Sequence, residues 1–205
     1  MIACLWDIDG TLLASGGGGK AAMEATLRAE FGIEAPIVYS SMTGRTDRGI
    51  ARDQFALHGI ANTPENWDRF IAAYLQFLPE KLIACQGSVL PGILDTLQFL
   101  TTETKVCVGL LTGNLPQGAQ VKLGHFGLAD FFAFGAFGDK HFDRDDVARE
   151  ALAGVHERCG AEVSLDRVFV VGDTPLYVAC ARAIGAHAVA VATGHYSLDQ
   201  LAETR

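Results

Sequence analysis

The sequence lacks the features that mark several common kinds of site. Its five cysteines are dispersed and form no CxxC pair, and its six histidines show no HExxH spacing. A zinc site of the usual kind is therefore not expected. Cys4 and Cys107 lie in apolar runs, where cysteine acts as a small hydrophobic residue, so we predict reduced thiols of the cytoplasmic type.

Positive charge is scarce as well. The chain has 16 lysines and arginines against 24 acidic residues, which gives a formal net charge of -8. Nucleic acids and anionic membranes are bound by basic patches, so we expect neither as a partner. The start of the sequence has no basic region ahead of an apolar stretch, and no apolar run reaches membrane-spanning length. A soluble, cytoplasmic protein is therefore expected.

Apolar residues are plentiful and fall into short runs. They make up 49% of the 205 residues, which is enough to bury a full core. From residue 91 onward the runs alternate with helical patterns. Strands are predicted at residues 2–6, 106–111, 131–137, 168–171 and 188–192. Strands buried on both faces and joined by helices indicate an α/β fold with a Rossmann-like, mostly parallel sheet.

The segment between the first two strands has a different character. It carries apolar residues at helical spacing, with helix starts at Thr46-Asp47 and Thr63-Pro64. We therefore predict a catalytic α/β domain made of residues 1–13 and 89–205, with a small helical cap domain of residues 14–88 inserted into it.

A run of glycines, Gly16–Gly19, opens this inserted segment. Followed by a lysine, it suggests a phosphate-binding P-loop. That pattern requires a glycine where Ala14 stands and a hydroxyl residue where Ala21 stands. We interpret the glycines as a flexible hinge instead.

Two carboxylates follow the first strand. Asp7 and Asp9 are two residues apart in extended backbone, so their side chains point the same way. Like charges held together need a cation or a proton, which is typical of a metal site or of paired nucleophilic and acid/base chemistry. An acidic turn at Asp9-Gly10 is the alternative. Thr112 and Asp173 also follow strands, and ligands bind at this edge of a parallel sheet, so the functional interpretation is favoured.

Two of these strand ends lead directly into helices, after Asn114 and after Thr174. Free N–H groups and the positive end of the helix dipole favour an anion at such a position. Asp7, Asp9 and Asp173 supply the oxygen ligands that Mg²⁺ prefers. A phosphate beside a magnesium ion indicates phosphoryl transfer, in which positioning and charge neutralisation dominate.

These residues also carry a resemblance to a known family. The segment Asp7–Leu12, with the sequence DIDGTL, resembles the first motif of the haloacid dehalogenase-like hydrolases. Leu111–Asn114 is similar to the second motif of that family, and Gly172-Asp173 to the fourth. The inserted helical unit is similar to the small cap of the phosphoglycolate phosphatase-like branch.

The resemblance implies a role for each motif. Asp7 would be the nucleophile that forms an aspartyl-phosphate, and Asp9 the general acid/base. Mg²⁺ would be held by Asp7, the backbone carbonyl of Asp9 and Asp173, so a chelator is expected to abolish activity. The residues that would bind the phosphate are Thr112, Gly113 and Asn114.

The chain departs from the family pattern at two places. The third motif should supply a cation, commonly a lysine before a proline, and that pair is absent. Spacing favours Arg144, with Lys140 second, and a solvated surface charge is the alternative for both. In the fourth motif Tyr177 stands where an acid is expected, four residues after Asp173, which predicts weaker Mg²⁺ binding or slower turnover. The acids that would compensate for it are Asp139, Asp143 or Asp145, whose positions the sequence does not define.

The resemblance implies that the cap closes over the site and sets specificity. Its most polar loop contains Thr43 and Arg45, and Arg45 is suited to a substrate carboxylate or a second phosphate. A helix cap with a surface arginine is the alternative. The expected partner is a small phosphorylated metabolite. The family usually continues into another strand after its last helix, so a shortened C-terminus is expected.

Asp9 favours a phosphatase over a true dehalogenase, which normally lacks that acid. Two other functions stay open. A phosphomutase shares both aspartates, and a non-catalytic metabolite-binding or regulatory protein on the same fold is compatible with Tyr177. The expected function is Mg²⁺-dependent hydrolysis of small phosphate monoesters.

Overall fold

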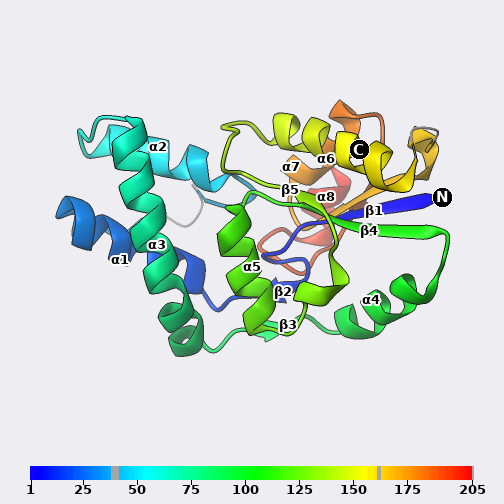
Figure 1. Cartoon of the computed structure of the whole chain (residues 1–205), viewed down its shortest axis with the longest axis horizontal. Helices are drawn as coiled ribbons and strands as arrows, with labels where there is room; N and C mark the ends of the chain where they lie inside the picture. Colours follow the sequence, from blue (N-terminus) through cyan, green and yellow to red (C-terminus); the bar gives the residue numbers. More distant parts are fainter. Residues whose placement is uncertain (38–41, 161–162, 205) are drawn as a thin grey trace.

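A five-stranded parallel sheet forms the centre of the α/β part of the molecule (Figure 1). The computed structural model describes residues 1–37, 42–160 and 163–204. The strand order is β5-β4-β1-β6-β7, and every neighbouring pair is parallel. The strands are β1 (Ile2–Trp6), β4 (Val106–Leu111), β5 (Gly135–Ala136), β6 (Val168–Gly172) and β7 (His187–Ala190). The predicted α/β fold is confirmed.

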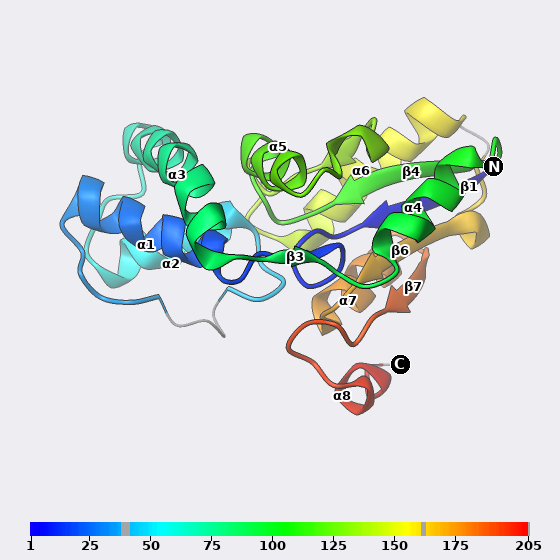
Figure 2. The same cartoon turned by 90° about the horizontal axis from the view of Figure 1, so that it is seen from below.

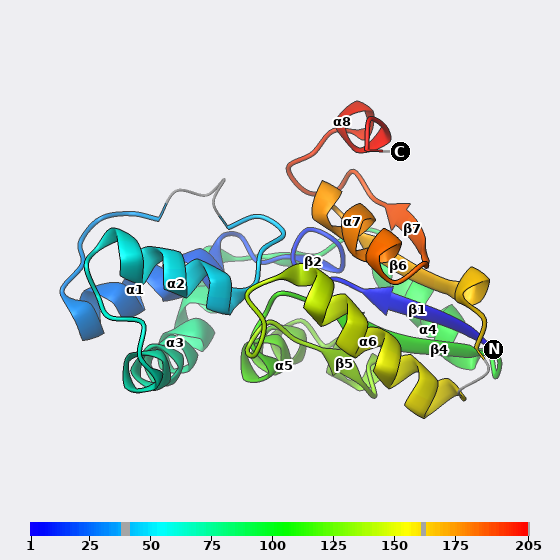
Figure 3. The same ribbon diagram turned by 90° about the horizontal axis from the view of Figure 1, so that it is seen from above.

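Helices cover both faces of this sheet, as Figures 2 and 3 show from opposite sides. The four helices are α4 (Ile93–Thr102), α5 (Pro116–His125), α6 (Arg144–Cys159) and α7 (Pro175–Ala183). The first two pack on the face that carries Trp6, and the last two pack on the face that carries Leu5. Because consecutive strand residues point to opposite faces, β1 is buried on both sides.

Three short helices complete this part of the chain. They are η2 (Ala129–Phe131), η3 (Leu165–Arg167) and α8 (Leu198–Ala202). The capping box predicted at the last of them is present, because Ser197 and Gln200 each bond the other's backbone N–H. Helix α8 lies beyond β7, away from the sheet (Figures 2 and 3).

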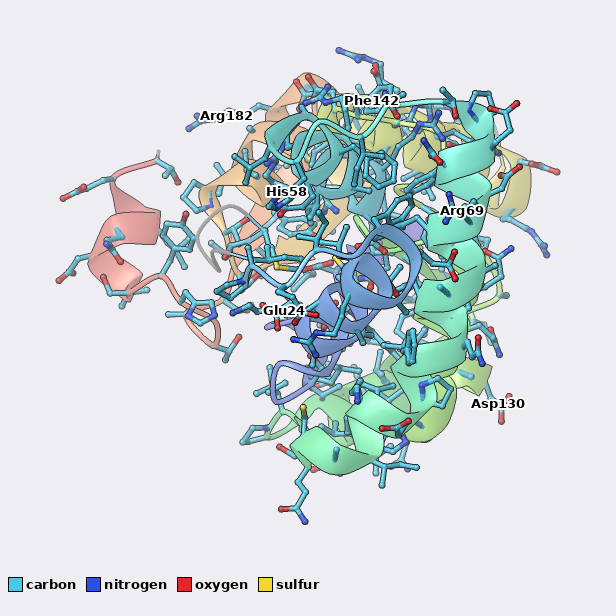
Figure 4. The ribbon with its side chains drawn as sticks, turned by 90° about the vertical axis from the view of Figure 1, so that its left-hand side faces the viewer. Glu24, His58, Arg69, Asp130, Phe142 and Arg182 are labelled. Carbon is cyan, nitrogen blue, oxygen red and sulfur yellow. A yellow bond between two sulfur atoms is a disulfide. The ribbon has the colours of Figure 1, made fainter. Side chains whose placement is uncertain are left out.

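Three helices between β1 and β4 form the cap, which Figure 4 shows from its outer side. They are α1 (Gly18–Phe31), α2 (Asp47–Leu57) and α3 (Pro64–Cys85). The predicted N-caps Thr46 and Thr63 both accept hydrogen bonds from backbone N–H groups. The three helices bury an aromatic cluster of their own around Phe55 and Phe70. Among the described residues, no helix is long and apolar enough to cross a membrane.

Two chain crossings connect the cap to the sheet, and they pair with each other. The short strands β2 (Leu13–Ala14) and β3 (Ser88–Val89) form an antiparallel ribbon. The boundaries predicted between residues 13 and 14 and between 88 and 89 fall on this ribbon. The division into two domains stays a prediction, with the ribbon as its natural border.

The glycine run expected to be a hinge is partly helical. Gly16 and Gly17 have positive φ angles of 63° and 89°, but α1 begins at Gly18. Gly18 and Gly19 are buried, and a Cβ atom at Gly19 would lie 3.2 Å from Lys122 Nζ. Close packing between α1 and the α/β core, and not flexibility alone, therefore accounts for these glycines.

The strand predicted over residues 131–137 is also much shorter than expected. Only Gly135–Ala136 pair with β4, the 3-10 helix η2 ends at Phe131, and residues 132–134 form neither helix nor strand. The aromatic residues of this segment pack against the core. Phe134, for example, lies over Gly109, where a Cβ atom would come within 2.4 Å of its ring.

The prediction of reduced thiols is wrong for one pair. Cys107 on β4 and Cys159 at the end of α6 form a disulfide. The two residues are 52 positions apart in sequence, so their spacing gave no hint of the pairing. The packing of α6 against β4 brings their Cα atoms to 6.3 Å. The cysteines without a disulfide are Cys4, Cys85 and Cys180.

Candidate active site

The ends of three neighbouring strands bring the predicted site residues together. Asp7 follows β1, Thr112 follows β4 and Asp173 follows β6. Because β1 lies between β4 and β6 in a parallel sheet, these ends meet at one edge. A cavity of about 480 Å³ lies there, with Asp7, Asp9 and Asp173 in its wall and cap residues on its other side.

Asp7 and Asp173 are both buried, with 5% and 3% of their surface exposed. Burial raises the pKa of Asp7 to about 6, although the nearby Arg144 guanidinium opposes the rise. Burial and then the charge of Asp7 raise the pKa of Asp173 to about 7. The two carboxylates therefore repel each other, and a cation between them would relieve the repulsion.

Glycines surround the Asp173 carboxylate. A Cβ atom at Gly10 would lie 2.3 Å from Asp173 Oδ2, and one at Gly194 would lie 1.8 Å from it. Any side chain at either position would displace the carboxylate. Asp173 Oδ1 is buried and has no hydrogen-bond partner among the described residues. An unpaired, buried carboxylate oxygen is a candidate metal ligand.

These residues fit a magnesium ion better than they fit a zinc ion. Nowhere in the described part of the chain do three or more His, Cys, Asp or Glu side chains gather closely enough to hold a metal alone. Mg²⁺ is usually held by one or two carboxylates, with waters and substrate phosphate completing the shell. Asp7 and Asp173 supply that number of carboxylates.

Asp9 is held by two donors from the core. Lys122 Nζ lies 2.6 Å from Asp9 Oδ2, and Asn114 Nδ2 lies 2.9 Å from the same oxygen. Burial favours a higher pKa for Asp9, but the charge and hydrogen bond of Lys122 outweigh it and lower this pKa. Lys122 therefore favours the ionised form of Asp9, and 37% of the Asp9 side chain stays exposed toward the cavity.

The second predicted motif forms the loop between β4 and α5. Thr112 is fully buried, and its hydroxyl accepts hydrogen bonds from the backbone N–H and Nδ2 of Asn114. Gly113 and Asn114 line the cavity. A Cβ atom at Gly113 would lie 2.0 Å from the carbonyl oxygen of Arg45, so only glycine fits beneath the cap loop.

Of the two cations proposed for the third motif, Arg144 lines the cavity and Lys140 does not. Arg144 is 5% exposed and lines the cavity, with its guanidinium 4.2 Å from the centre of the Tyr177 ring. Burial disfavours its charge, but Tyr177 and then Asp7 outweigh burial and raise its pKa. Lys140 lies outside the cavity, 68% exposed, with Nζ 3.6 Å from Glu150.

Tyr177 occupies the position of the expected acid in the first turn of α7. It is 2% exposed, lines the cavity and lies so close to Gly172 that a Cβ atom there would meet its ring at 2.2 Å. The three acids suggested as substitutes stand elsewhere. Asp143 caps α6 by accepting the N–H of Asp145, and Asp139 offers its backbone carbonyl to Arg48. The position of the missing acid is therefore filled by an aromatic ring.

The cap loop contributes the predicted specificity residues. Thr43 and Arg45 both line the cavity. Arg45 Nη2 lies 2.7 Å from Asp53 Oδ2, so the guanidinium is oriented from α2. The Arg45 side chain is 29% exposed, and a role in substrate binding stays a prediction beside the alternative of a helix cap with a surface arginine.

Three buried polar residues that were not predicted from the sequence meet where the cap touches the core: Lys122 of α5, Asp47 of α2 and Tyr74 of α3. Lys122 shares the buried face of α5 with Ala119 and Leu123, and a lysine between apolar residues at this spacing is its only sign in the sequence. Asp47 was assigned only to a helix start. Tyr74 was assigned to the apolar stripe of α3.

Comparison with known proteins supports the same assignment. The family model of the haloacid dehalogenase-like hydrolases matches residues 1–185. The phosphoglycolate phosphatase of Rhodospirillum rubrum is 32% identical over 215 residues, which covers 98% of this chain and 83% of that protein. The chain therefore belongs to the haloacid dehalogenase-like hydrolases. It is an enzyme of the phosphatase class.

Solved structures share its fold. A hydrolase from Pseudomonas syringae has a TM-score of 0.74 at 22% identity, covering 100% of this chain and 90% of that one. A predicted phosphoglycolate phosphatase from Haemophilus somnus 129PT has a TM-score of 0.72 at 16% identity, with the same coverage of 100% and 90%. At such identities the likeness shows the common fold.

Proposed function

We propose that this chain is a Mg²⁺-dependent phosphatase of small phosphate monoesters and that it works through an aspartyl-phosphate formed on Asp7. The observation that carries the proposal is the position of Asp7. It is buried beside the Arg144 guanidinium on one side and the carboxylate of Asp173 on the other. A carboxylate in this setting is suited to attack a phosphate whose charge its neighbours neutralise.

In the first half of the reaction, an Asp7 oxygen forms a bond to phosphorus as the bond to the leaving oxygen breaks. Asp9, in its protonated form, delivers a proton to that leaving oxygen and becomes a carboxylate. Arg144 balances the negative charge of the transferred phosphoryl group. Asp7, Asp173 and the backbone carbonyl of Asp9 would hold Mg²⁺, which would supply the positive charge that lets a carboxylate approach a phosphate dianion.

In the second half, Asp9 accepts a proton from a water molecule, and the water oxygen bonds to phosphorus. The bond between phosphorus and Asp7 breaks, which releases inorganic phosphate, restores the Asp7 carboxylate and leaves Asp9 protonated for the next cycle. The lowered pKa of Asp9 suits this step, because a base must be ionised before it acts.

The cavity supports a small substrate. Its volume of about 480 Å³ is shared between the carboxylate edge and the cap loop that carries Thr43 and Arg45. An arginine in the wall of such a cavity is suited to a carboxylate or a second phosphate. Together with the phosphoglycolate phosphatase relative, this favours a small phosphorylated metabolite of the phosphoglycolate kind.

Phosphate release from phosphoglycolate, glycerol phosphate and glucose 1-phosphate tests the proposal, with Mg²⁺ and with EDTA. EDTA should stop release, and Asp7→Asn should lower it at least about a thousandfold, as expected when a nucleophile is removed. Asp130→Asn is the matched control, because Asp130 is an exposed acid on η2 (Figure 4). Release that survives Asp7→Asn would show that the assigned mechanism is wrong. Isomerisation of glucose 1-phosphate without net release would indicate a phosphomutase.

A further inference from the structure

Lys122 is the buried cation that the proposed mechanism leaves without a role. It is 4% exposed and lies within α5, on the core side of the site. Its Nζ atom is 2.6 Å from Asp9 Oδ2 and 2.6 Å from Asn114 Oδ1. Since Asn114 Nδ2 also donates to Asp9 Oδ2, the three side chains form a closed ring of hydrogen bonds.

This ring fixes one oxygen of Asp9. Asp9 Oδ2 receives both donors, so the carboxylate cannot turn without breaking a charged hydrogen bond in a buried place. The Ser15 side chain also hydrogen-bonds this carboxylate, and the other carboxylate oxygen lies outside the ring. Asn114 is itself anchored, because its Nδ2 lies 2.8 Å from the Thr112 hydroxyl at the end of β4. Asp9 is thus tied to the rigid edge of the sheet.

The cap approaches Lys122 from the other side. A Cβ atom at Gly19 would lie 3.2 Å from Lys122 Nζ and 3.7 Å from the Tyr74 hydroxyl. The Tyr74 hydroxyl is fully buried and has no hydrogen-bond partner in the described part of the structure. A buried ion pair contributes little net stability compared with an apolar pair of the same size, so stability alone does not account for an ammonium group here.

We propose that Lys122 is a positioning residue for Asp9, which holds the carboxylate in place for the hydrolysis of the aspartyl-phosphate. This inference rests on the proposed function. In that step Asp9 takes a proton from water, the water oxygen bonds to phosphorus, and the bond from phosphorus to Asp7 breaks. Lys122 does not touch the reacting atoms. It acts by keeping Asp9 Oδ2 fixed, so that the other oxygen faces the water.

The two halves of the reaction can be measured separately with 4-nitrophenyl phosphate. Nitrophenolate is a weak base and leaves without a proton, so its release depends on Asp7 and little on Asp9. Hydrolysis of the aspartyl-phosphate still needs Asp9. The ratio kcat/KM reports transfer to Asp7, and kcat also includes hydrolysis. A residue that only supports folding would change both quantities together.

The variants are Lys122→Met, Lys122→Arg and the control Lys105→Met, which removes an exposed lysine ahead of β4. For Lys122→Met we expect kcat to fall about a hundredfold, as for loss of a positioned base. We expect kcat/KM to stay within about fivefold, and a burst of one nitrophenolate per active site to precede slow turnover. Lys122→Arg should restore most of kcat. Equal losses in kcat and kcat/KM without a burst, or no loss at all, would overturn the proposal.

A crystal structure of Lys122→Met gives a second measurement that is independent of activity. Asp9 should leave the position in which its Oδ2 bonds Asn114. If Asp9 stays there, the proposal is wrong even when turnover falls. If Lys122→Met does not fold, Lys122→Gln takes its place in both experiments. Wild-type protein that releases no nitrophenolate would contradict the proposed function. The position of Asp9 in the crystal structure of the variant would then be the remaining test of the inference.

Discussion

The carboxylate of Asp47, in the first turn of cap helix α2, accepts a hydrogen bond from the backbone N–H of Leu115, which directly precedes α5 of the core, with an N···O distance of 2.8 Å. The backbone N–H of Asp47 donates in return to the carbonyl of Gly113 at 2.7 Å. A cap residue thus satisfies a free N–H at the start of a core helix. This contact joins the cap to the strand-end loop that carries the second motif.

Replacement of Asp47 by asparagine should make stability less dependent on pH. Burial raises the pKa of Asp47 from its ordinary value of 3.8 to about 6. The folded protein therefore binds this proton more tightly than the unfolded chain does. The stabilising contribution of the protonated group is complete below pH 3.8 and is lost as the pH rises through 6. Asp47→Asn stays neutral, so relative to wild type it should gain roughly 1–3 kcal/mol between pH 4.5 and pH 8.

Urea denaturation at the two pH values measures this difference. The side-chain oxygen of asparagine can still accept the Leu115 N–H. Asp47→Ala loses that bond and should be less stable than Asp47→Asn at both pH values, typically by about 1 kcal/mol. A constant difference between Asp47→Asn and wild type across the pH range would contradict the prediction.

Arg144, and not Lys140, should prove to be the cation of the third motif. Its guanidinium lies beside Asp7 in the cavity, whereas Lys140 pairs with Glu150 at the surface. Arg144→Met should lower kcat/KM at least about a hundredfold, because a preorganised positive charge at the phosphoryl group is lost. Lys140→Met should change kcat/KM by no more than about twofold. Thermal melting of both variants shows whether the fold survives, and a larger loss for Lys140→Met would reverse the assignment.

Tyr177→Asp should strengthen Mg²⁺ binding. The variant places a carboxylate at the position where the family has one, near Asp7. A further oxygen ligand near the metal should lower the Mg²⁺ concentration needed for half-saturation. The loss of a buried ring should also destabilise the protein by roughly 2–4 kcal/mol.

Tyr177→Phe is the control for this experiment, because it keeps the ring over Arg144 and adds no acid. Calorimetric titration of the metal-free variants with Mg²⁺ measures binding without relying on turnover. If Tyr177→Asp and Tyr177→Phe bind Mg²⁺ equally, the side chain at residue 177 takes no part in metal binding here.

The mostly parallel sheet, the polar residues at its strand ends and the cap helices could be predicted because each depends on local patterns. Apolar runs, Thr46 and Thr63 as N-caps, and acids at strand ends are all visible in the sequence. Lys122 and Asp47 could not be predicted, since their roles depend on contacts between the cap and the core across a long sequence separation. The strand predicted over residues 131–137 is too long, because aromatic residues there, such as Phe134, pack against the core instead of extending the edge of the sheet.

The disulfide between Cys107 and Cys159 gives the last prediction. It ties β4, which leads to Thr112, to the end of the helix that begins with Arg144. Closing a loop of 52 residues restricts the unfolded chain, which should stabilise the fold by roughly 2–4 kcal/mol. Reduction with dithiothreitol, or Cys107→Ser, should lower the free energy of unfolding by that amount. Cys85→Ser, which removes a cysteine outside the disulfide, is the control and should respond to reduction as wild type does. Wild-type protein whose stability is the same with and without reductant would show that the bond contributes nothing to the fold.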